Sequence, residues 1–274
     1  MYLEHFGLRK RPFSKTPDPA FLFESREHGE ALARLSWALE EREVAVLTGE
    51  VGAGKTTLSR ALVDAFADRC RFAFVVNPAL PPAQLIGAIA AAFGIEGRRR
   101  KVETFAALAE LFGDLDRQGT FPVVMIDEAQ LLAGRSAYDE LRLLTNLVAD
   151  DRALVGLVLL GQPELRARLP EKGGEAFAQR VGVAYHLGPL DVEETGRYLA
   201  HRLSVAGRTA PLFDAGAVSL LHARSGGVPR VVNQLASSAL LEGFVRGCTT
   251  IEADVVAAAV SELDRWLGGR VERE

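Results

Sequence analysis

The sequence predicts an α/β fold with a parallel sheet, followed by a smaller region made only of helices. Five short apolar runs alternate with amphipathic helical patterns, and each run is typical of a buried strand. These runs are Val44–Leu47, Phe72–Val76, Pro122–Ile126, Leu154–Leu160 and Val183–Leu187. From Asp191 onward the strand patterns disappear while helical spacing continues. We therefore expect a strap at residues 1–25, an α/β domain at 26–190, a helical lid at 191–267 and a polar tail at 268–274.

The expected helices are bounded by capping and breaking residues. Prolines open the helix Pro81–Phe93 and Gly94 closes it, the positions at which these residues do least harm. The other helices expected in the α/β region are Glu27–Glu41, Leu58–Ala65, Thr104–Asp116, Tyr138–Ala149 and Glu175–Val181. Those expected in the lid are Glu193–Ala206, Asp214–Ala223, Pro229–Val245 and Glu252–Trp266.

Composition and charge limit the classes of protein to consider. Hydrophobic residues make up 48% and charged residues 25%, which is typical of soluble globular proteins. A net charge of −4 argues against a protein that coats nucleic acid through bulk charge, although a local basic patch stays open. Cys70 and Cys248 lack metal-ligand spacing, so we expect two free thiols in a reducing compartment.

No transmembrane segment or signal peptide is expected. The sequence holds no apolar run near the ~18 residues that a bilayer requires, and its first residues lack a signal-peptide core. We expect a cytoplasmic location, with a peripheral position at the inner membrane as an extension of it.

A glycine-rich turn lies between the first strand and its helix, in the segment VAVLTGEVGAGKTT from Val44 to Thr57. It fits the pattern Gly-x-x-x-x-Gly-Lys-Thr. Glycines lack the Cβ that would keep successive amides from converging on one phosphate at a helix start. Lys55 is expected at the β- and γ-phosphates, Thr56 at Mg²⁺ and Thr57 at the α-phosphate. The full predicted binding set is Gly49, Gly52, Ala53, Gly54, Lys55, Thr56 and Thr57. The alternative is an ordinary glycine-rich turn.

Two carboxylates follow the third strand in the segment PVVMIDEAQ, at residues 122–130. Parallel sheets bind ligands beyond the carboxyl ends of their strands, so Asp127 and Glu128 should emerge at the same edge as the glycine-rich turn. This is the pattern of a Walker B element, in which Asp127 holds Mg²⁺ and Glu128 orients the attacking water. Together the two motifs predict an ATPase whose ligands are ATP and Mg²⁺. Solvated carboxylates at a strand end are the alternative.

Two further polar residues are candidates for contact with the γ-phosphate. Gln162 follows the fourth strand and would sense that phosphate or position the water, but it also suits a turn before Pro163. Arg230 stands at a helix start, where a cation opposes the helix dipole, so we expect a phosphate partner. A surface arginine is the alternative.

Arg180 is the candidate for an arginine finger. It precedes the fifth strand at the far end of the sheet, so it would reach the nucleotide of a neighbouring subunit rather than its own. Arg166 and Arg168 compete for this role in trans, and a plain surface position is the alternative for Arg180.

The densest basic run in the sequence lies between two expected helices. Its charges are Arg98, Arg99, Arg100 and Lys101. Most such runs are solvated loops, and a contact with the phosphates of DNA or with an acidic neighbour is the sharper alternative.

The strap shows neither helical nor alternating periodicity, because prolines interrupt it. We expect an extended segment whose aromatic residues cap the core, namely Phe6, Phe13, Phe21 and Phe23. The alternative is that Phe13 or Pro17 borders an adenine pocket.

In combination these motifs resemble the AAA+ ATPases, and in detail the ExeA/GspA family of general-secretion ATPases. The matching pieces run in order along essentially the whole chain. They are Tyr2-x-x-x-Phe6-Gly7, Pro12-Phe13, Pro17-Asp18-Pro19, Leu47–Thr56, Ile126–Gln130, Gly161–Leu165, Ala178–Arg180 and Gly227–Arg230. The resemblance implies a RecA-like sheet with strand order 5-1-4-3-2, a helical lid and ATP at their junction. It also implies a hexamer-like ring or other oligomer, with Arg180 as the finger and Arg230 as the second sensor.

Two functions are compatible with this resemblance. The first is an ATP-driven motor that assembles a secretion, secretin or pilus-type system with an envelope partner. Family members commonly continue into a transmembrane segment and a peptidoglycan-binding region; the sequence holds neither, which fits a truncated chain or a role away from the wall. The second is a DNA-associated regulator similar to the MuB and TniB transposition ATPases, which form filaments on DNA. Net acidity favours the first function, and the basic run, repeated around a ring, favours the second.

Overall fold

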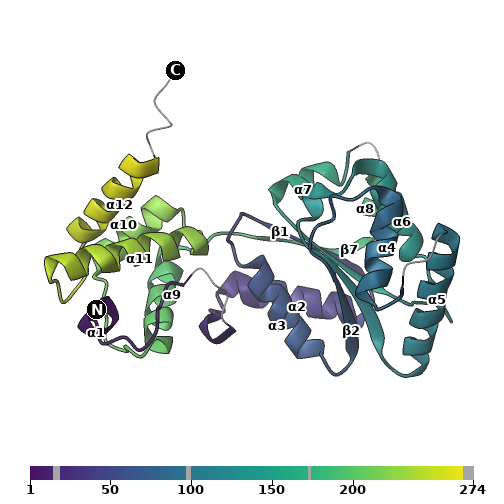
Figure 1. The fold of residues 1–274 in the computed structure, drawn as a ribbon, viewed down its shortest axis with the longest axis horizontal. Helices are drawn as coiled ribbons and strands as arrows, with labels where there is room; N and C mark the ends of the chain where they lie inside the picture. The colour runs from purple at the N-terminus through teal and green to yellow at the C-terminus, as the bar shows by residue number, and fades with distance from the viewer. Residues whose placement is uncertain (15–18, 97–99, 172–173, 268–274) are drawn as a thin grey trace, which may run out of the picture. The chain divides into compact units, whose positions relative to one another are not determined.

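The computed structural model describes residues 1–14, 19–96, 100–171 and 174–267. They form two compact units, each with its own hydrophobic core (Figure 1). The sheet unit consists of Arg26–Glu50 and Leu58–Leu187. The helical unit consists of Met1–Ser25, Val51–Thr57 and Gly188–Glu274, so the N-terminal strap belongs to it.

Five parallel strands form the large sheet, in the order β2-β3-β6-β1-β7. Their bounds are β1 Val44–Gly49, β2 Cys70–Val75, β3 Phe121–Ile126, β6 Gly156–Gly161 and β7 Val181–Leu187. Counted along the chain within this sheet, the order is 2-3-4-1-5, which is the expected 5-1-4-3-2 read from the opposite edge. The labels differ because β4 and β5 form a separate hairpin that the sequence did not predict.

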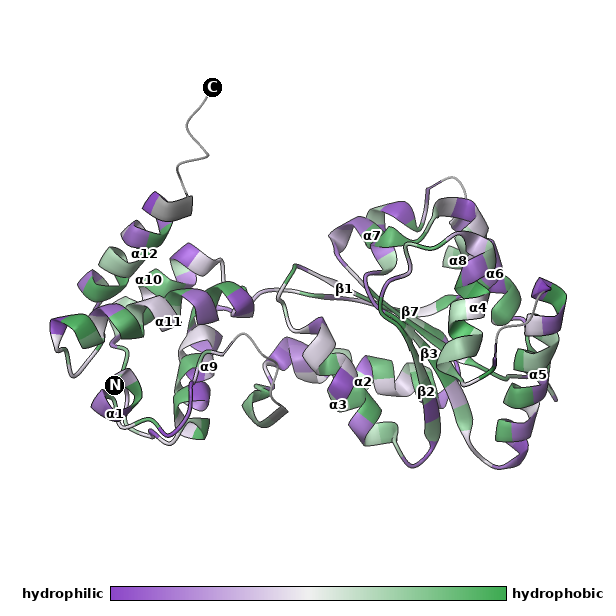
Figure 2. Ribbon diagram, in the orientation of Figure 1, coloured by the Kyte–Doolittle hydropathy of each residue, from purple (hydrophilic) through white to green (hydrophobic). Residues whose placement is uncertain are grey.

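The central strands β1, β3 and β6 are buried along their whole length. Such burial requires helices on both faces of the sheet. Figure 1 shows α2 (Arg26–Glu40) and α3 (Lys55–Phe66) on one side of it. On the other side lie α4 (Pro82–Ala92), α5 (Lys101–Arg117) and α6 (Gly134–Leu144). The central strands are accordingly green in Figure 2, whereas α5 mixes green and purple.

Strand β2 lies at the edge of the sheet, so only one of its faces is covered where the sequence predicted a second buried strand. Ala73 and Val75 face the core, but Phe74 is 48% exposed. The Phe74 ring stacks on that of Phe72, with 6.4 Å between the centroids. An apolar run alone does not reveal whether a strand has one neighbour or two, and among the described strands β2 pairs with β3 alone.

The segment after α6 is a hairpin, which corrects the expected helix Tyr138–Ala149. Helix α6 ends at Leu144, and β4 (Val148–Ala149) pairs antiparallel with β5 (Arg152–Ala153). Asp150 and Asp151 between them have φ of 47° and 64°. Two successive positive φ values are those of a type I′ turn, whose twist matches a two-residue hairpin. Aspartate tolerates this left-handed region because its short side chain can hydrogen-bond locally.

Four helices form the body of the helical unit, as predicted from Asp191 onward. They are α9 Val192–Val205, α10 Ala215–Ser225, α11 Pro229–Arg246 and α12 Ala253–Leu267. The Asp191 carboxylate accepts a bond from the Glu194 N–H, and the Glu194 carboxylate accepts one from the Asp191 N–H. This reciprocal cap satisfies N–H groups that a helix start leaves without partners. Among the helices of the described residues, none is long and apolar enough to cross a membrane.

The strap contains two short helical pieces, α1 (Tyr2–His5) and the 3-10 turn Pro19–Phe21, where the sequence predicted neither. Its aromatic residues pack as the core-capping expectation requires. Three are buried in the core of the helical unit and one is partly buried against it, in the order Phe6, Phe13, Phe21 and Phe23. Pro17, the other residue considered for an adenine pocket, lies outside the described residues.

Candidate functional site

The polar residues predicted for catalysis follow the carboxyl ends of neighbouring strands. Because β3, β6 and β1 are parallel, these ends lie at one edge of the sheet. Asp127 and Glu128 follow β3, Gln162 follows β6, and the chain leaves β1 at Gly49 to enter the glycine-rich loop. The order of the strands therefore places the predicted motifs together at the carboxyl ends of β1, β3 and β6.

Glu128 and Gln162 are in direct contact, and Gln130, which the sequence analysis quoted but gave no role, contacts both. The Nε2 of Gln162 donates to Oε2 of Glu128 at 3.1 Å. The Nε2 of Gln130 donates to the same oxygen at 2.5 Å, and the Gln130 Oε1 accepts from the Gln162 N–H at 3.0 Å. The sequence signals for Gln130 were its place two residues after Glu128 and its position at the end of the matching segment Ile126–Gln130.

The backbone holds both carboxylates at the end of β3. The Asp127 N–H donates to the Val75 carbonyl at 3.0 Å, which ties this point to the end of β2. The Asp127 Oδ1 accepts from the Glu128 N–H at 2.8 Å. Glu128 itself has φ 49° and ψ 39°, a left-handed conformation that costs a non-glycine residue about 1–2 kcal/mol. Strain of this kind is common at functional sites.

The glycine-rich loop has the backbone conformations that only glycine adopts readily. Gly52 and Gly54 have φ of 89° and 109°, so two of the three glycines predicted for phosphate binding stand where side chains would be strained. Lys55 is the first residue of α3 and is 9% exposed. Within the helical unit, the Arg230 N–H donates to the Gly52 carbonyl at 3.3 Å. A Cβ on Gly52 would lie 2.3 Å from that of Arg230, so the approach requires glycine.

Arg180 lies at the opposite edge of the sheet. Helix α8 (Glu175–Ala178) is shorter than the expected Glu175–Val181, and Arg180 falls between it and β7. Val181 pairs with Val44, the first residue of β1. Because β7 has seven residues, this edge lies about 20 Å from the carboxyl end of the strand. Arg180 therefore stands far from the edge that carries Glu128.

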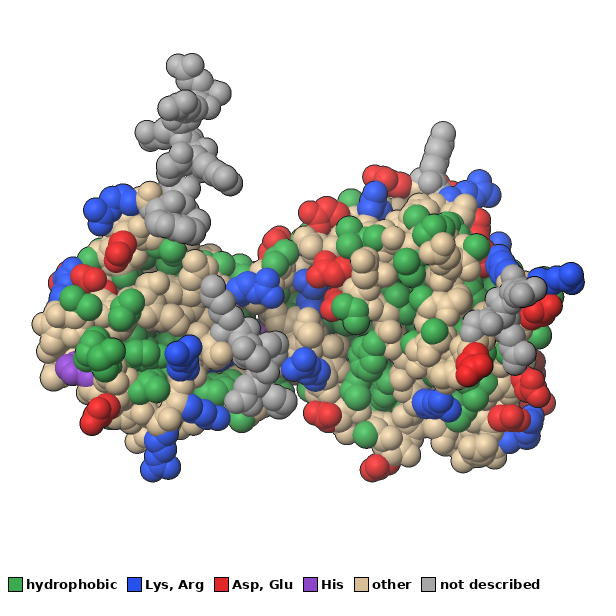
Figure 3. All heavy atoms as spheres, viewed as in Figure 1, with side chains coloured by type: hydrophobic (Ala, Val, Ile, Leu, Met, Phe, Trp, Pro, Cys, Tyr) green, Lys and Arg blue, Asp and Glu red, His purple; other side chains and the backbone are tan. Residues whose placement is uncertain are grey.

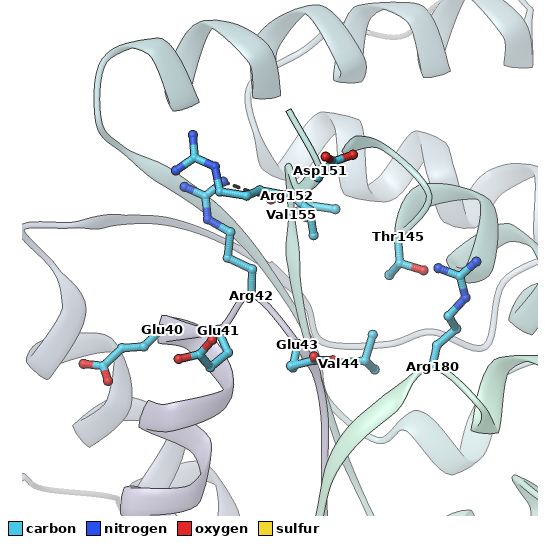
Figure 4. A pocket seen from close by; sticks show the side chains of 11 residues that line it. Glu40, Glu41, Arg42, Glu43, Val44, Thr145, Asp151, Arg152, Val155 and Arg180 are labelled. Carbon is cyan, nitrogen blue, oxygen red and sulfur yellow. Dashed lines mark hydrogen bonds between the residues drawn. The ribbon is translucent and has the colours of Figure 1, made fainter. Parts of the chain in front are cut away.

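The Arg180 side chain borders a hollow of about 510 Å³. Figure 4 shows it on the side of Thr145, across the hollow from Arg42. Arg42 is bound at 2.7 Å to Asp116 and at 2.9 Å to the Ala153 carbonyl. Arg180, by contrast, makes no side-chain hydrogen bond or ion pair with any residue that the structure describes. This leaves its guanidinium available to a ligand from outside the subunit.

The competing arginines lie on α7 (Pro163–Arg168), whose N-cap is Gln162. Arg168 donates from Nη1 to the Gln130 carbonyl, so it is engaged inside its own subunit. Arg166 is exposed.

The basic run is only partly within the described residues, because Arg98 and Arg99 lie outside them. Lys101 pairs with Glu140 at 2.5 Å, and Arg100 approaches Glu103 at 4.0 Å. On the face that Figure 3 shows, acidic and basic side chains are interspersed. DNA binding by this run stays a prediction, and the described cations of the run have acidic partners within the chain.

The comparisons with known proteins fit this geometry. A protein-family profile described as AAA domain matches residues 38–169. General secretion pathway protein A of Aeromonas hydrophila is 40% identical over 273 residues, which cover 96% of this chain and 48% of that protein. The chain thus spans about half the length of the curated relative that it matches.

Two solved structures show the same fold. The Aeropyrum pernix ORC2 protein, solved as ADPNP and ADP complexes, has a TM-score of 0.67 at 21% identity. The match covers 92% of this chain and 71% of the ORC2 chain. CDC6P from Pyrobaculum aerophilum has a TM-score of 0.70 at 19% identity, and the match covers 92% of this chain and 70% of the CDC6P chain. The predicted fold class is confirmed by these similarities and by the strand order.

Proposed function

The chain belongs to the AAA+ family, and from this premise we propose that it binds ATP and hydrolyses it with Mg²⁺ bound. The observation that carries the proposal is the position of Glu128. Its carboxylate stands beyond β3 and is held by Gln162 from the neighbouring strand β6, at the edge where β1 leads into the glycine-rich loop. A carboxylate held there is suited to orient and deprotonate a water molecule.

The donor groups of the two motifs fit the magnesium complex of ATP. The hydroxyl of Thr56 and the carboxylate of Asp127 supply the oxygen ligands that Mg²⁺ prefers. When bound, the ion would neutralise charge on the phosphates. In this proposal the loop amides from Gly49 to Thr57 bind the phosphates, and Lys55 adds a positive charge at the β- and γ-phosphates.

Gln162, Arg230 and Arg180 complete the proposed reaction centre. Gln162 would contact the γ-phosphate and would couple its presence to the position of the Glu128 carboxylate, because the Gln162 amide already contacts that carboxylate. Arg230 would act from the helical unit, and its backbone contact with Gly52 supports this. Arg180 would act on the nucleotide of a neighbouring copy in a ring or filament, because it lies at the opposite edge of the sheet.

The proposed process is the assembly of a secretion or secretin/pilus-type system. Its support is the similarity to general secretion pathway protein A. The nucleotide state would change the association of the chain with other copies, or with an envelope partner, on the cytoplasmic side of the inner membrane.

ATP binding is tested with Lys55→Ala. We expect the variant to lose measurable affinity for a fluorescent ATP analogue, because Lys55 supplies the charge that faces the phosphates. Arg60→Ala removes an exposed cation from the same helix and should bind as the wild type does. Unchanged affinity in Lys55→Ala would contradict the loop assignment.

Hydrolysis is tested with Glu128→Gln. Loss of a general base lowers turnover by about 10²- to 10⁴-fold, whereas ATP affinity should stay within about threefold of the wild type. Phosphate release and nucleotide titration measure the two quantities, with the exposed Glu110→Gln as the matched control. Normal turnover in Glu128→Gln would remove Glu128 from the role of base.

A further inference from the structure

Gln130 lies in a short 3-10 turn, Ala129–Leu131, directly after the left-handed residue Glu128. The Leu131 N–H donates to the Glu128 carbonyl at 2.8 Å and closes this turn. The reversal of the chain brings the side chain of residue 130 back toward that of residue 128. Gln130 is 8% exposed, although glutamine is a residue that proteins mostly leave at the surface.

Gln130, Glu128 and Gln162 form a closed ring of hydrogen bonds, which consists of their side chains and the backbone N–H of Gln162. Gln130 Nε2 and Gln162 Nε2 both donate to Glu128 Oε2, at 2.5 Å and 3.1 Å. The ring closes where Gln130 Oε1 accepts from the Gln162 N–H at 3.0 Å. Gln130 is thus the member that contacts the other two through opposite ends of its amide.

The direction of these bonds follows from chemistry. A backbone N–H can only donate, so the atom of Gln130 that faces Gln162 N must be the amide oxygen. The amide nitrogen must then face Glu128, and an ionised carboxylate can only accept. Neither glutamate nor methionine, which are similar to glutamine in size, would satisfy both neighbours. The carboxylate of glutamate lacks the donor, and the apolar side chain of methionine lacks both donor and acceptor.

The surroundings hold Gln130 in this orientation. Its carbonyl accepts a bond from Arg168, and this bond does not involve the side chain. Gly161, at the end of β6, leaves room for the amide, because a Cβ there would lie 3.2 Å from Gln130 Oε1 and 2.7 Å from Leu165 Cδ2. Gly161 at the end of β6 and Arg168 on α7 therefore both adjoin Gln130, one at its side-chain amide and the other at its backbone carbonyl.

We propose that Gln130 is a positioning residue for hydrolysis. Its side-chain amide fixes the position of the Glu128 carboxylate relative to Gln162 by bonding to both residues. This inference rests on the proposed ATPase function. Gln130 would not touch the nucleotide, since its amide is committed to Glu128 and to the backbone of Gln162. Its removal should therefore lower turnover and leave ATP binding unchanged.

The test is Gln130→Met, which keeps the length of the side chain and removes the amide. We expect kcat to fall about 10- to 100-fold, the factor that one hydrogen bond to a charged group supplies, with KM within about threefold. Gln130→Glu keeps the acceptor for the Gln162 N–H but turns a carboxylate toward Glu128. Its kcat should therefore fall at least as far as that of Gln130→Met. The exposed Gln84→Met is the matched control and should retain the wild-type kcat.

A double-mutant cycle separates positioning from general stability. If Gln130 acts through Glu128, then Gln130→Met should cost less than about threefold in a Glu128→Gln background. A loss of the same size in both backgrounds, or a kcat within about threefold of the wild type in both Gln130 variants, would overturn the inference. If Gln130→Met fails to fold, the isosteric Gln130→Glu gives the decision.

The failure of this inference differs from that of the proposed function. The inference alone fails if Glu128→Gln is inactive while the Gln130 variants turn over normally. Absence of ATP hydrolysis by the wild-type chain would overturn the proposed function, and the role of Gln130 with it.

Discussion

Gly226 and Gly227 are neighbours that place different demands on the backbone. Both have positive φ, 58° and 72°. Gly226 ends α10, and a Cβ there would meet no atom within 4 Å. A Cβ on Gly227 would lie 2.0 Å from the Leu190 carbonyl oxygen, because the Leu190 N–H donates to the Gly227 carbonyl at 3.0 Å. The first glycine serves conformation alone, and the second also allows close packing of two backbones.

We predict that Gly227→Ala destabilises the helical unit more than Gly226→Ala does. The alanine at 226 costs about 1–2 kcal/mol, the cost of a left-handed residue. The alanine at 227 adds a steric conflict with a carbonyl, for a total of about 2–5 kcal/mol. Urea unfolding followed by circular dichroism measures both, and equal losses in the two variants would contradict the packing argument.

At the scale of elements, the strap is tied to α9 by one buried arginine. Arg202 is 8% exposed and donates from Nε to the Pro12 carbonyl at 2.6 Å and from Nη1 to the Tyr198 hydroxyl at 3.0 Å. Its guanidinium also lies 4.6 Å from the centroid of the Phe21 ring. Burial raises the pKa of Tyr198, so its hydroxyl stays protonated and donates to Asn233 Oδ1 at 2.9 Å.

We predict that Arg202→Met loosens the strap and destabilises the helical unit by about 2–4 kcal/mol, because buried acceptors lose their donors. Arg197→Met is the control on the same helix. Its side chain is 67% exposed and lies 3.8 Å from Glu194, so its loss should cost about 0–1 kcal/mol. Urea unfolding gives the stabilities, and limited proteolysis reports on residues 1–25. Equal protection of the strap in both variants would show that Arg202 does not anchor it.

At the scale of the whole molecule, the sheet has two functional edges in the proposed mechanism. One carries Glu128 and Gln162 beyond the carboxyl ends of β3 and β6. The other carries Arg180 before the amino end of β7. A guanidinium at the second edge can serve hydrolysis only if copies of the chain meet edge to edge, so the proposed activity depends on association.

We predict that ATPase activity per subunit rises with protein concentration and falls about 10³-fold or more in Arg180→Ala, the effect of a lost finger in trans. Mixing Arg180→Ala with Lys55→Ala should restore part of the activity, because each supplies what the other lacks. Arg166→Ala removes the exposed side chain of a competing arginine on α7, and this variant should keep full activity if Arg180 is the finger. Activity independent of concentration, together with no recovery on mixing, would return Arg180 to the class of surface residues.

The sequence predicted the helices and strands better than it predicted their neighbours in space and the exposure of their faces. It anticipated all five strands of the sheet and the four helices after Asp191, because apolar spacing reports how a segment is buried. It missed the hairpin around Asp150–Asp151 because the helical spacing of Leu141 and Leu144 continues to Val148, past the end of α6 at Leu144. It missed the exposed face of β2 because the position of a strand in a sheet depends on residues far along the chain.

By itself, the sequence determined the strands, the helices after Asp191 and the glycine-rich loop, since burial periodicity and the need for positive φ at Gly52 and Gly54 are local properties. Only the tertiary structure decided which polar groups meet at the edge of the sheet. Gln130 and Gln162 are 32 residues apart in the chain, and their contact exists because β3 and β6 pair side by side. A hydrogen bond depends on distance and direction in space, which no spacing along a single segment contains.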